Sequence, residues 1–255
     1  MENSIDKKGH PKGLYFLFFT EMWERFSYYG MRAIFILFMT KILLLKDSDA
    51  SEIYGSYTGL VYLTPLLGGY LCDKFLGNRR SIIIGGLLMA IGQFFMFLSA
   101  SAGSEGGIAI MWLGLTSIII GNGFFKPNIS TMVGQLYPAG DRRIDSAFTI
   151  FYMGINLGAF FSPLVCGSMD FKWGFLAACI GMIISLICFI IYQKQYLISE
   201  EGKEIGLPVK KLNFQSILLN KHIKFTLVLN RKLPYSSLKK SNNLYCINNI
   251  HVFSS

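Results

Sequence analysis

The sequence has few charged residues and few side chains that bind metals. Only 15% of its 255 residues are Asp, Glu, Lys or Arg, whereas about a quarter is usual in soluble domains. Its three histidines lie in polar segments, and its five cysteines form no CxxC pair or Cys/His cluster. We therefore expect no metal site, and we interpret the cysteines as small buried apolar residues.

Motifs for catalysis are missing as well. The sequence contains no HExxH motif and no set of residues that resembles a nucleophile with its general base. Its formal net charge of +9 is of the sign that nucleic-acid-binding proteins carry. However, the basic residues lie between and beyond the apolar runs, which is typical of membrane topology. We expect neither an enzyme nor a nucleic-acid partner.

Apolar residues, by contrast, make up 52% of the chain, and the mean hydropathy is +0.44. A bilayer core ~30 Å thick is crossed by about 20 apolar residues in a helix. The first apolar run is too long and too charged for a secretory signal, so we interpret it as an uncleaved helix. The predicted spans are residues 14–45, 53–71, 81–101, 108–133, 144–168 and 173–192.

The sequence thus predicts an all-α membrane protein in three parts. Residues 1–13 form a polar tail, residues 14–193 a bundle of six transmembrane helices, and residues 194–255 a polar linker with an unassigned tail. From about residue 212 the tail shows no helical or strand period. It is either a natural segment or the product of a shifted reading frame.

The loop charges predict the orientation of this bundle. By the positive-inside rule, both the N-terminus and the C-terminal tail lie in the cytoplasm, in a multi-pass protein of the plasma (inner) membrane. The loops on the opposite side contain acids and only two bases. The basic residues on the predicted cytoplasmic side are Lys7, Lys8, Lys12, Lys74, Arg79, Arg80, Arg142 and Arg143.

The first span carries charges that a membrane helix rarely has. In the stretch "FFTEMWERFSYYGMRAIF", six polar side chains fall within an arc of roughly 140° at 100° per residue. Such an arc indicates either a buried salt bridge that fixes helix packing or a polar substrate path with a protonatable carboxylate. The six residues are Glu21, Glu24, Arg25, Tyr28, Tyr29 and Arg32.

Two later spans also hold isolated polar groups. Lys126 lies beside Pro127 in "GNGFFKPNISTMVGQLY", where it either pairs with a carboxylate of the first span or reaches the membrane surface. Asn156 in "FYMGINLGAFFSP" either lines a polar site or hydrogen-bonds between helices. The glycine pairs Gly154/Gly158 and Gly55/Gly59 are interpreted as points of close helix packing.

The turn "GGYLCDKFLGNRRS" joins the second and third spans. Its charges either set the topology alone or form a charge latch, in which Asp73 pairs with Arg79 and Arg80 and separates when helix bundles move.

Three segments together resemble one family. "EMWERFSYYGMR" is similar to the ExxERFxYYG signature of the proton-dependent oligopeptide transporters, and "FFKPNISTMVGQLY" is similar to their FxKPNxxxxxGxLY segment. "GGYLCDKFLGNRR" resembles the corresponding loop of the wider major facilitator superfamily. The resemblance covers about residues 12–210. It implies the N-terminal half of a major facilitator fold, with proton-coupled symport of di- and tripeptides.

The resemblance also implies roles for single residues. Proton coupling falls to Glu21, Glu24 and Arg25, with Lys126 as the lysine that pairs with them. It implies no cofactor beyond the proton as coupling ion; the partners are small peptides, protons and the lipid bilayer. The positions that line the peptide pocket are Tyr28, Tyr29, Arg32, Tyr62 and Asn156.

The chain departs from the family in having six predicted helices where members have about twelve. A C-terminal half or a second copy is therefore an expected partner, and the chain alone is expected to be inactive in transport. The alternative is a non-transporting membrane subunit or interaction protein derived from such a transporter.

Overall fold

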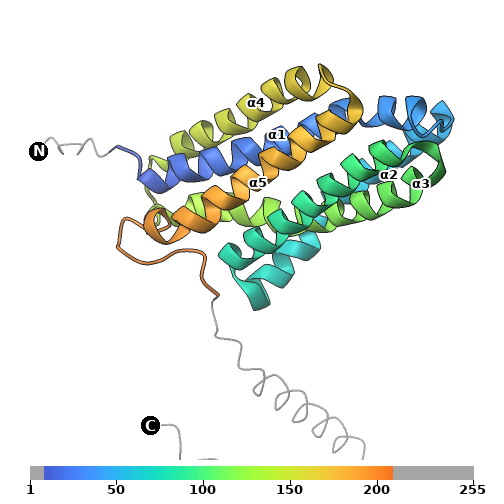
Figure 1. Cartoon of the computed structure of the whole chain (residues 1–255). Coiled ribbons are helices and arrows are strands. Elements are labelled where there is room, and N and C mark those ends of the chain that lie inside the picture. Colours follow the sequence, from blue (N-terminus) through green and yellow to red (C-terminus); the bar gives the residue numbers. More distant parts are fainter. Residues whose placement is uncertain (1–8, 209–255) are drawn as a thin grey trace, which may run out of the picture. The chain divides into compact units, whose positions relative to one another are not determined.

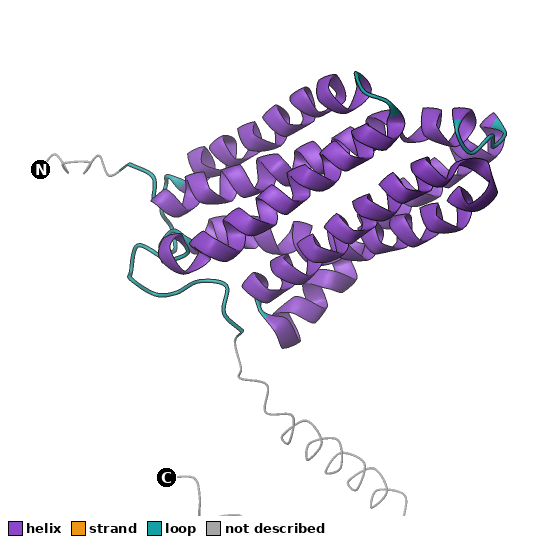
Figure 2. Ribbon diagram, viewed as in Figure 1, coloured by secondary structure: helices purple, strands orange, loops and turns teal. Residues whose placement is uncertain are grey.

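The computed structural model describes residues 9–208, and nearly all of these residues are helical (Figures 1 and 2). The tail from residue 212 lies outside the described residues. A short π-helical turn, Cys72–Leu76, follows the second helix. The helices are α1 (Lys12–Lys41), α2 (Asp47–Leu71), α3 (Asn78–Gln135), α4 (Ile144–Gly167) and α5 (Phe171–Tyr196).

Helix α3 consists of two antiparallel segments that meet at Gly103. This glycine has φ +68° and ψ −153°, a conformation that is accessible to glycine and costly for other residues. The contacts between the segments are symmetric about it, since Gly85 lies against Gly121 and Gly92 against Gly114. Ser99 donates a hydrogen bond of 2.6 Å to the main-chain oxygen of Gly107 in the same register. The predicted third and fourth spans are therefore the two arms of one hairpin.

Helix α1 lies between α4 and α5 (Figure 1). It runs parallel to α4, because Phe18 contacts Gly154 and Met22 contacts Gly158 in one constant register. A Cβ atom at Gly154 would lie 2.9 Å from the main-chain oxygen of Phe18. Gly154 and Gly158 therefore let two helix backbones approach closely, which confirms the interpretation of this pair.

Helix α5 runs antiparallel to α1. Ser185 of α5 donates a hydrogen bond of 2.8 Å to the main-chain oxygen of Thr20, while Gly13 at the start of α1 lies against Tyr196 at the end of α5. Helix α2 runs parallel to the second arm of α3, because Thr64 donates a hydrogen bond of 3.1 Å to the main-chain oxygen of Ile119 and Gly68 lies against Gly123 in the same register. The helical segments thus alternate in direction along the chain.

Gly55 and Gly59 pack against no helix of the described region, so their interpretation as packing points stays a prediction. Both glycines are exposed on α2, and a Cβ atom at either would meet nothing within 4 Å among the described residues. A spacing of four puts two glycines on one helix face, but the fold decides whether another helix covers that face.

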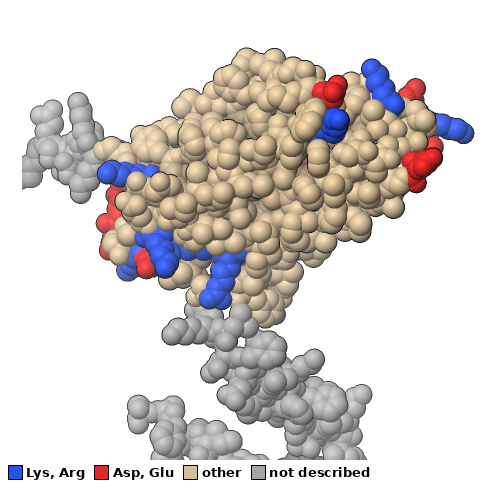
Figure 3. Space-filling model, in the orientation of Figure 1, with Lys and Arg blue, Asp and Glu red and all other residues tan. Residues whose placement is uncertain are grey.

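Three helices of the described region are long and apolar enough to cross a membrane, namely α3, α4 and α5. On the face shown in Figure 3, the charged side chains gather mainly near the two ends, and the surface between them is largely uncharged. This distribution is typical of membrane proteins. All six segments predicted from the sequence are helical, and their number of membrane crossings stays a prediction.

Matched glycine substitutions test the packing of α1 against α4. We expect Gly158→Ala to lower the free energy of unfolding by about 1–3 kcal/mol, because its Cβ would contact the main-chain oxygen of Met22. The exposed Gly59→Ala is the control, and we expect it to leave stability unchanged or raise it by up to ~1 kcal/mol through helix propensity. Thermal unfolding in detergent measures both, and equal effects would contradict the packing described here.

Candidate functional site

The charged residues of α1 form a buried cluster. The Nε atom of Arg25 lies 2.8 Å from Oε1 of Glu21 and 2.5 Å from Oε2 of Glu24. Glu21, Glu24 and Arg25 have relative exposures of 2%, 0% and 3%. A single guanidinium therefore faces two carboxylates in an environment shielded from solvent. The face predicted from the helical arc is thus an interior face of the bundle.

With both carboxylates ionised, this cluster would contain more negative than positive charge. Two ionised carboxylates and one guanidinium leave one negative charge without a counter-ion. Oε1 of Glu24, Oε2 of Glu21 and Nη2 of Arg25 are buried without a hydrogen-bond partner among the described residues. Because an unbalanced buried charge is costly, such a cluster favours the approach of a further cation or the uptake of a proton.

Lys126 is the nearest candidate for that cation. It lies on the second arm of α3, close enough to interact electrostatically with Glu21, Glu24 and Arg25. Within the described region it forms no ion pair; its Nζ atom lies 5.0 Å from the centroid of the Tyr62 ring instead. The structure therefore places Lys126 beside the cluster without the predicted ion pair.

A second polar group lies further along α1. Arg32 donates hydrogen bonds from Nε and Nη2 to the hydroxyl of Tyr54, at 3.0 and 2.7 Å. Its guanidinium carbon also lies 5.5 Å from the ring centroids of Tyr28 and Tyr54 and 5.9 Å from that of Tyr29. The predicted residues Tyr28, Tyr29 and Arg32 are thus brought together.

A cavity of about 260 Å³ opens beside Arg32. It lies where α1, α2 and α4 meet, so three helices contribute to one polar recess. The residues that line this cavity include one arginine and two tyrosines. The cavity is lined by Tyr29, Arg32, Ala33, Tyr54, Ala159 and Pro163.

Three of the predicted pocket residues are not among those that line this cavity: Tyr28 is buried beside Arg32, and Tyr62 and Asn156 are exposed. Tyr62 of α2 is 62% exposed, and Asn156 of α4 is exposed about one turn before Ala159. Asn156 makes no hydrogen bond with a described residue through its side chain. Both side chains lie on open helix faces, where a further protein segment or a ligand could reach them.

Tyr54 and Tyr57 of α2 belong to this region but were not predicted from the sequence. Tyr54 binds Arg32, while the buried ring of Tyr57 packs edge-on against Phe35 at 5.8 Å. The hydroxyl of Tyr57 has no hydrogen-bond partner among the described residues. The two tyrosines are three residues apart, on the same face of the helix as Val61. This spacing in the sequence indicates one face of α2 that is turned toward another helix.

The predicted charge latch is not formed among the described residues. Asp73 and Arg80 are exposed, and neither forms an ion pair with another described residue. Arg79 is 7% exposed and binds the segment that follows α5: its Nη1 atom lies 3.0 Å from Oε2 of Glu204, and Nη2 donates to the main-chain oxygen of Leu197 at 2.7 Å. Both arginines lie at the start of α3, where the side chain of Arg79 points inward and that of Arg80 points to solvent.

The segment 197–206 packs against the end of the bundle and is thus more than a linker. Leu197 and Ile205 are buried in the core, and the main-chain NH of Gly206 donates to Oε1 of Gln135 at 3.0 Å. We call residues 197–206 the end strap. It bridges the two arms of α3, because Arg79 begins one arm and Gln135 ends the other.

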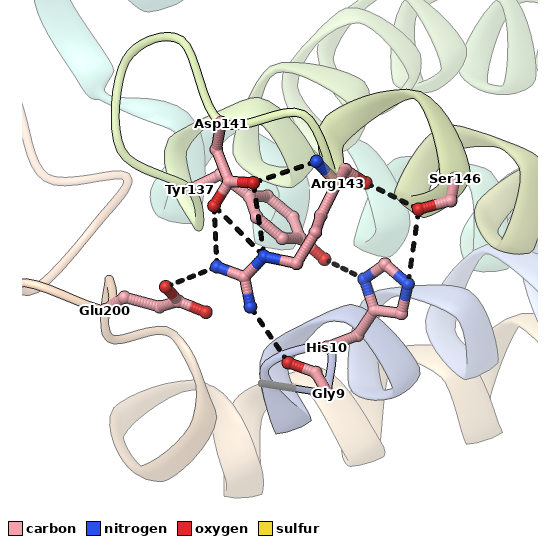
Figure 4. Close-up of polar contacts among 7 residues, drawn as sticks. All are labelled: Gly9, His10, Tyr137, Asp141, Arg143, Ser146 and Glu200. Carbon is pink, nitrogen blue, oxygen red and sulfur yellow. Dashed lines mark hydrogen bonds and ion pairs between the residues drawn. The ribbon is translucent and has the colours of Figure 1, made fainter. Parts of the chain in front are cut away.

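Arg143 forms a second network at the same end (Figure 4). Its Nη2 atom lies 2.6 Å from both Oδ2 of Asp141 and Oε2 of Glu200, and Nη1 donates to the main-chain oxygen of Gly9 at 3.0 Å. Hydrogen bonds from Arg143 hold the pKa of Asp141 below its ordinary value. Arg143 thus joins the chain before α1, the turn before α4 and the end strap.

An aromatic pair completes this network. Tyr137 lies under the guanidinium of Arg143, with 5.5 Å between the ring centroid and Cζ, and its hydroxyl is 2.8 Å from Nδ1 of His10. Nε2 of His10 lies 3.4 Å from the hydroxyl of Ser146. Burial raises the pKa of Tyr137 to about 12, so the phenol stays protonated at neutral pH.

Comparisons with known proteins place these features in a family context. The sequence profile of the POT family matches residues 79–253. A peptide transporter of Yersinia enterocolitica is 43% identical over 190 residues, which are 71% of this chain and 36% of that protein. A di-/tripeptide transporter of Lactococcus lactis is 39% identical over 212 residues, 79% of this chain and 41% of that protein.

A solved structure agrees with the fold. The crystal structure of a POT peptide transporter in complex with alafosfalin gives a TM-score of 0.72 at 38% identity, over 88% of this chain and 46% of that one. The chain therefore spans less than half the length of these relatives. The family match extends past residue 212, into the tail for which no helix or strand is predicted from the sequence.

Neighbouring arginines test the role of the end strap. We expect Arg79→Ala to lower stability by about 1.5–3 kcal/mol through loss of the charge-assisted hydrogen bond to Leu197. It should also raise hydrogen exchange and proteolysis within residues 197–206. The exposed Arg80→Ala is the matched control and should change neither. If hydrogen exchange and proteolysis within residues 197–206 were the same in both variants, Arg79 would not hold the end strap in place.

Asp141 gives the second network a pH dependence. Its pKa is lowered in the folded protein, so its contact with Arg143 stabilises the fold above about pH 4 and is lost as pH falls through the folded-state value. We expect Asp141→Asn to lower the thermal midpoint at pH 7 and to differ less from the parent protein at pH 3. Exposed Asp170→Asn is the control. If the difference in thermal midpoint were as large at pH 3 as at pH 7, the stabilising contact between Asp141 and Arg143 would be contradicted.

Proposed function

Since the chain belongs to the POT family of peptide transporters, we propose that it supplies the N-terminal helical bundle of a proton-coupled di- and tripeptide symporter. The observation that carries the proposal is the arrangement along α1. A buried cluster of two carboxylates and one guanidinium lies two turns before an arginine that borders an open polar cavity. A proton site and a peptide site are thus built on one rigid element.

Proton coupling is assigned to Glu21, Glu24 and Arg25. A proton on either carboxylate neutralises the excess charge and leaves one ion pair with Arg25. Lys126 achieves the same neutrality if it leaves Tyr62 and approaches the carboxylates. Proton uptake and pairing with Lys126 are therefore alternatives. Each of the two favours its own position of α3 relative to α1.

This competition links protonation to alternating access. In the state described here, Lys126 lies over the Tyr62 ring, which leaves the carboxylates available to a proton. Movement of Lys126 toward Glu21 and Glu24 would displace that proton and shift the second arm of α3. Symport follows if peptide binding favours the protonated state.

The peptide site is assigned to the cavity beside Arg32. A guanidinium binds carboxylates strongly and with defined geometry, and here it is open on the cavity side. We assign it to the carboxyl terminus of the peptide, with Tyr28, Tyr29 and Tyr54 around it. Tyr62 and Asn156 complete the site from the adjoining faces of α2 and α4.

Those adjoining faces need a partner in the membrane. Helices α2 and α4 expose large apolar side chains around Tyr62 and Asn156, including Leu66 and Phe160. We propose that a C-terminal half, or a second copy of the chain, covers these faces and closes the peptide site. The bundle lies in the plasma membrane, with residues 9–11 and the end strap on the cytoplasmic side.

A chimaera tests the proposed roles in a complete transporter. Residues 1–208 of this chain are joined to the second half of the Yersinia enterocolitica relative and placed in proteoliposomes. We expect Glu24→Gln to abolish dipeptide uptake driven by a pH gradient while peptide exchange continues, because exchange needs no net proton movement. Glu52→Gln, which changes an exposed acid at the start of α2, is the matched control.

Three results would decide between the parts of this proposal. Gradient-driven uptake that survives in Glu24→Gln would remove the proton role from that carboxylate. Loss of exchange as well would assign Glu24 to peptide binding or to folding. Robust uptake by the 255-residue chain alone would show that no second half is needed.

A further inference from the structure

A groove lies between α1 and α5 on the side of α1 that faces away from the buried charges. At 100° per residue, Tyr15 lies about 180° from Glu24 on α1. The groove has a volume of about 390 Å³, which is within the range of small-molecule sites. It is lined by Lys12, Tyr15, Phe16, Phe19, Cys188, Tyr192 and Tyr196.

The groove has an apolar base and an aromatic wall. Phe16 stacks on Phe189 at 5.7 Å and lies 5.9 Å from Tyr196, while Tyr192 and Tyr196 are 5.8 Å apart, centroid to centroid. Phe16 is nearly buried, whereas Phe19 is 48% exposed and forms the open side. Such a surface suits a hydrocarbon chain that lies along α1.

The mouth of the groove is polar and positive. In the antiparallel register of α1 and α5, Lys12 lies level with Tyr196 and Tyr15 lies level with Tyr192. No acidic residue lines the groove, and Lys12 forms no ion pair with a described residue. Tyrosine and lysine at one level are typical of the boundary between hydrocarbon and head groups.

We propose that this groove binds one anionic phospholipid. The acyl chain lies against Phe16, Phe19 and Cys188, and the phosphate group pairs with Lys12 while the tyrosine hydroxyls donate to its oxygens. Charge complementarity selects this occupant, because Lys12 lies at the end of an apolar groove and, among the described residues, neither pairs with an acid nor has an acidic residue beside it in the lining. The proposal rests on the membrane placement of the bundle and not on proton coupling or peptide transport.

Anionic lipid also suits the predicted side of the membrane. Lys12 lies at the end of the bundle that carries Arg79, Arg143 and the end strap, which the positive-inside rule places in the cytoplasm. The cytoplasmic leaflet is the one with negative surface potential. A bound lipid would join the two helices at the level where α1 begins and α5 ends.

Lipid titration followed by native mass spectrometry tests the proposal on the full chain. The detergent-solubilised protein is titrated with phosphatidylglycerol and, separately, with phosphatidylcholine. We expect one tight phosphatidylglycerol site whose dissociation constant rises about fivefold in Lys12→Gln, which corresponds to about 1 kcal/mol per lysine near a membrane surface. Lys41→Gln removes an exposed lysine from the other end of α1 and should leave binding unchanged.

Two further measurements separate the contribution of the head-group contact from that of the acyl-chain contact. Cys188→Trp fills the groove and should abolish the tight site while the thermal midpoint stays near that of the parent protein. Inorganic phosphate in excess should not displace the lipid. The proposal is overturned if Lys12→Gln and Lys41→Gln bind alike, if phosphatidylcholine binds as tightly as phosphatidylglycerol, or if phosphate alone competes.

Discussion

The burial of two carboxylates against a single guanidinium on α1 is the constraint on which the rest of the structure depends. Charges in the interior of a membrane bundle must be enclosed, so α1 needs neighbours on most of its sides. Gly158 allows α4 to approach so closely that a Cβ atom there would lie 2.9 Å from Cβ of Arg25. The small residues of the neighbouring helices therefore allow the close packing that encloses the charges of α1.

The sequence predicted the helices well and their partners less well. Apolar length and helical period located every helix of the described region and put Glu21, Glu24 and Arg25 on one interior face. Period alone does not reveal which neighbour a side chain meets. Lys126 was assigned to the carboxylates but lies over Tyr62, and Arg79 was assigned to Asp73 but binds Glu204, more than a hundred residues away. Such choices depend on tertiary contacts.

The two ends of the charged helix have different surroundings. Toward the start of α1, Arg79 and Arg143 fasten the end strap and the turn before α4 through buried and half-buried contacts. Toward Arg32, the residues are held by tyrosines around an open cavity, and the adjoining faces of α2 and α4 are uncovered. The bundle is therefore closed by polar contacts at one end, while its polar recess opens to one side.

The symmetry of α3 about Gly103 has a consequence for the order of folding. Contacts between its arms join residues close in sequence, so they need little loop closure and form at low entropic cost. The contacts of α1 with α4 and α5 span most of the described chain and can form only after those helices have been synthesised. The α3 hairpin can therefore assemble early, and the buried charges of α1 acquire their full enclosure last.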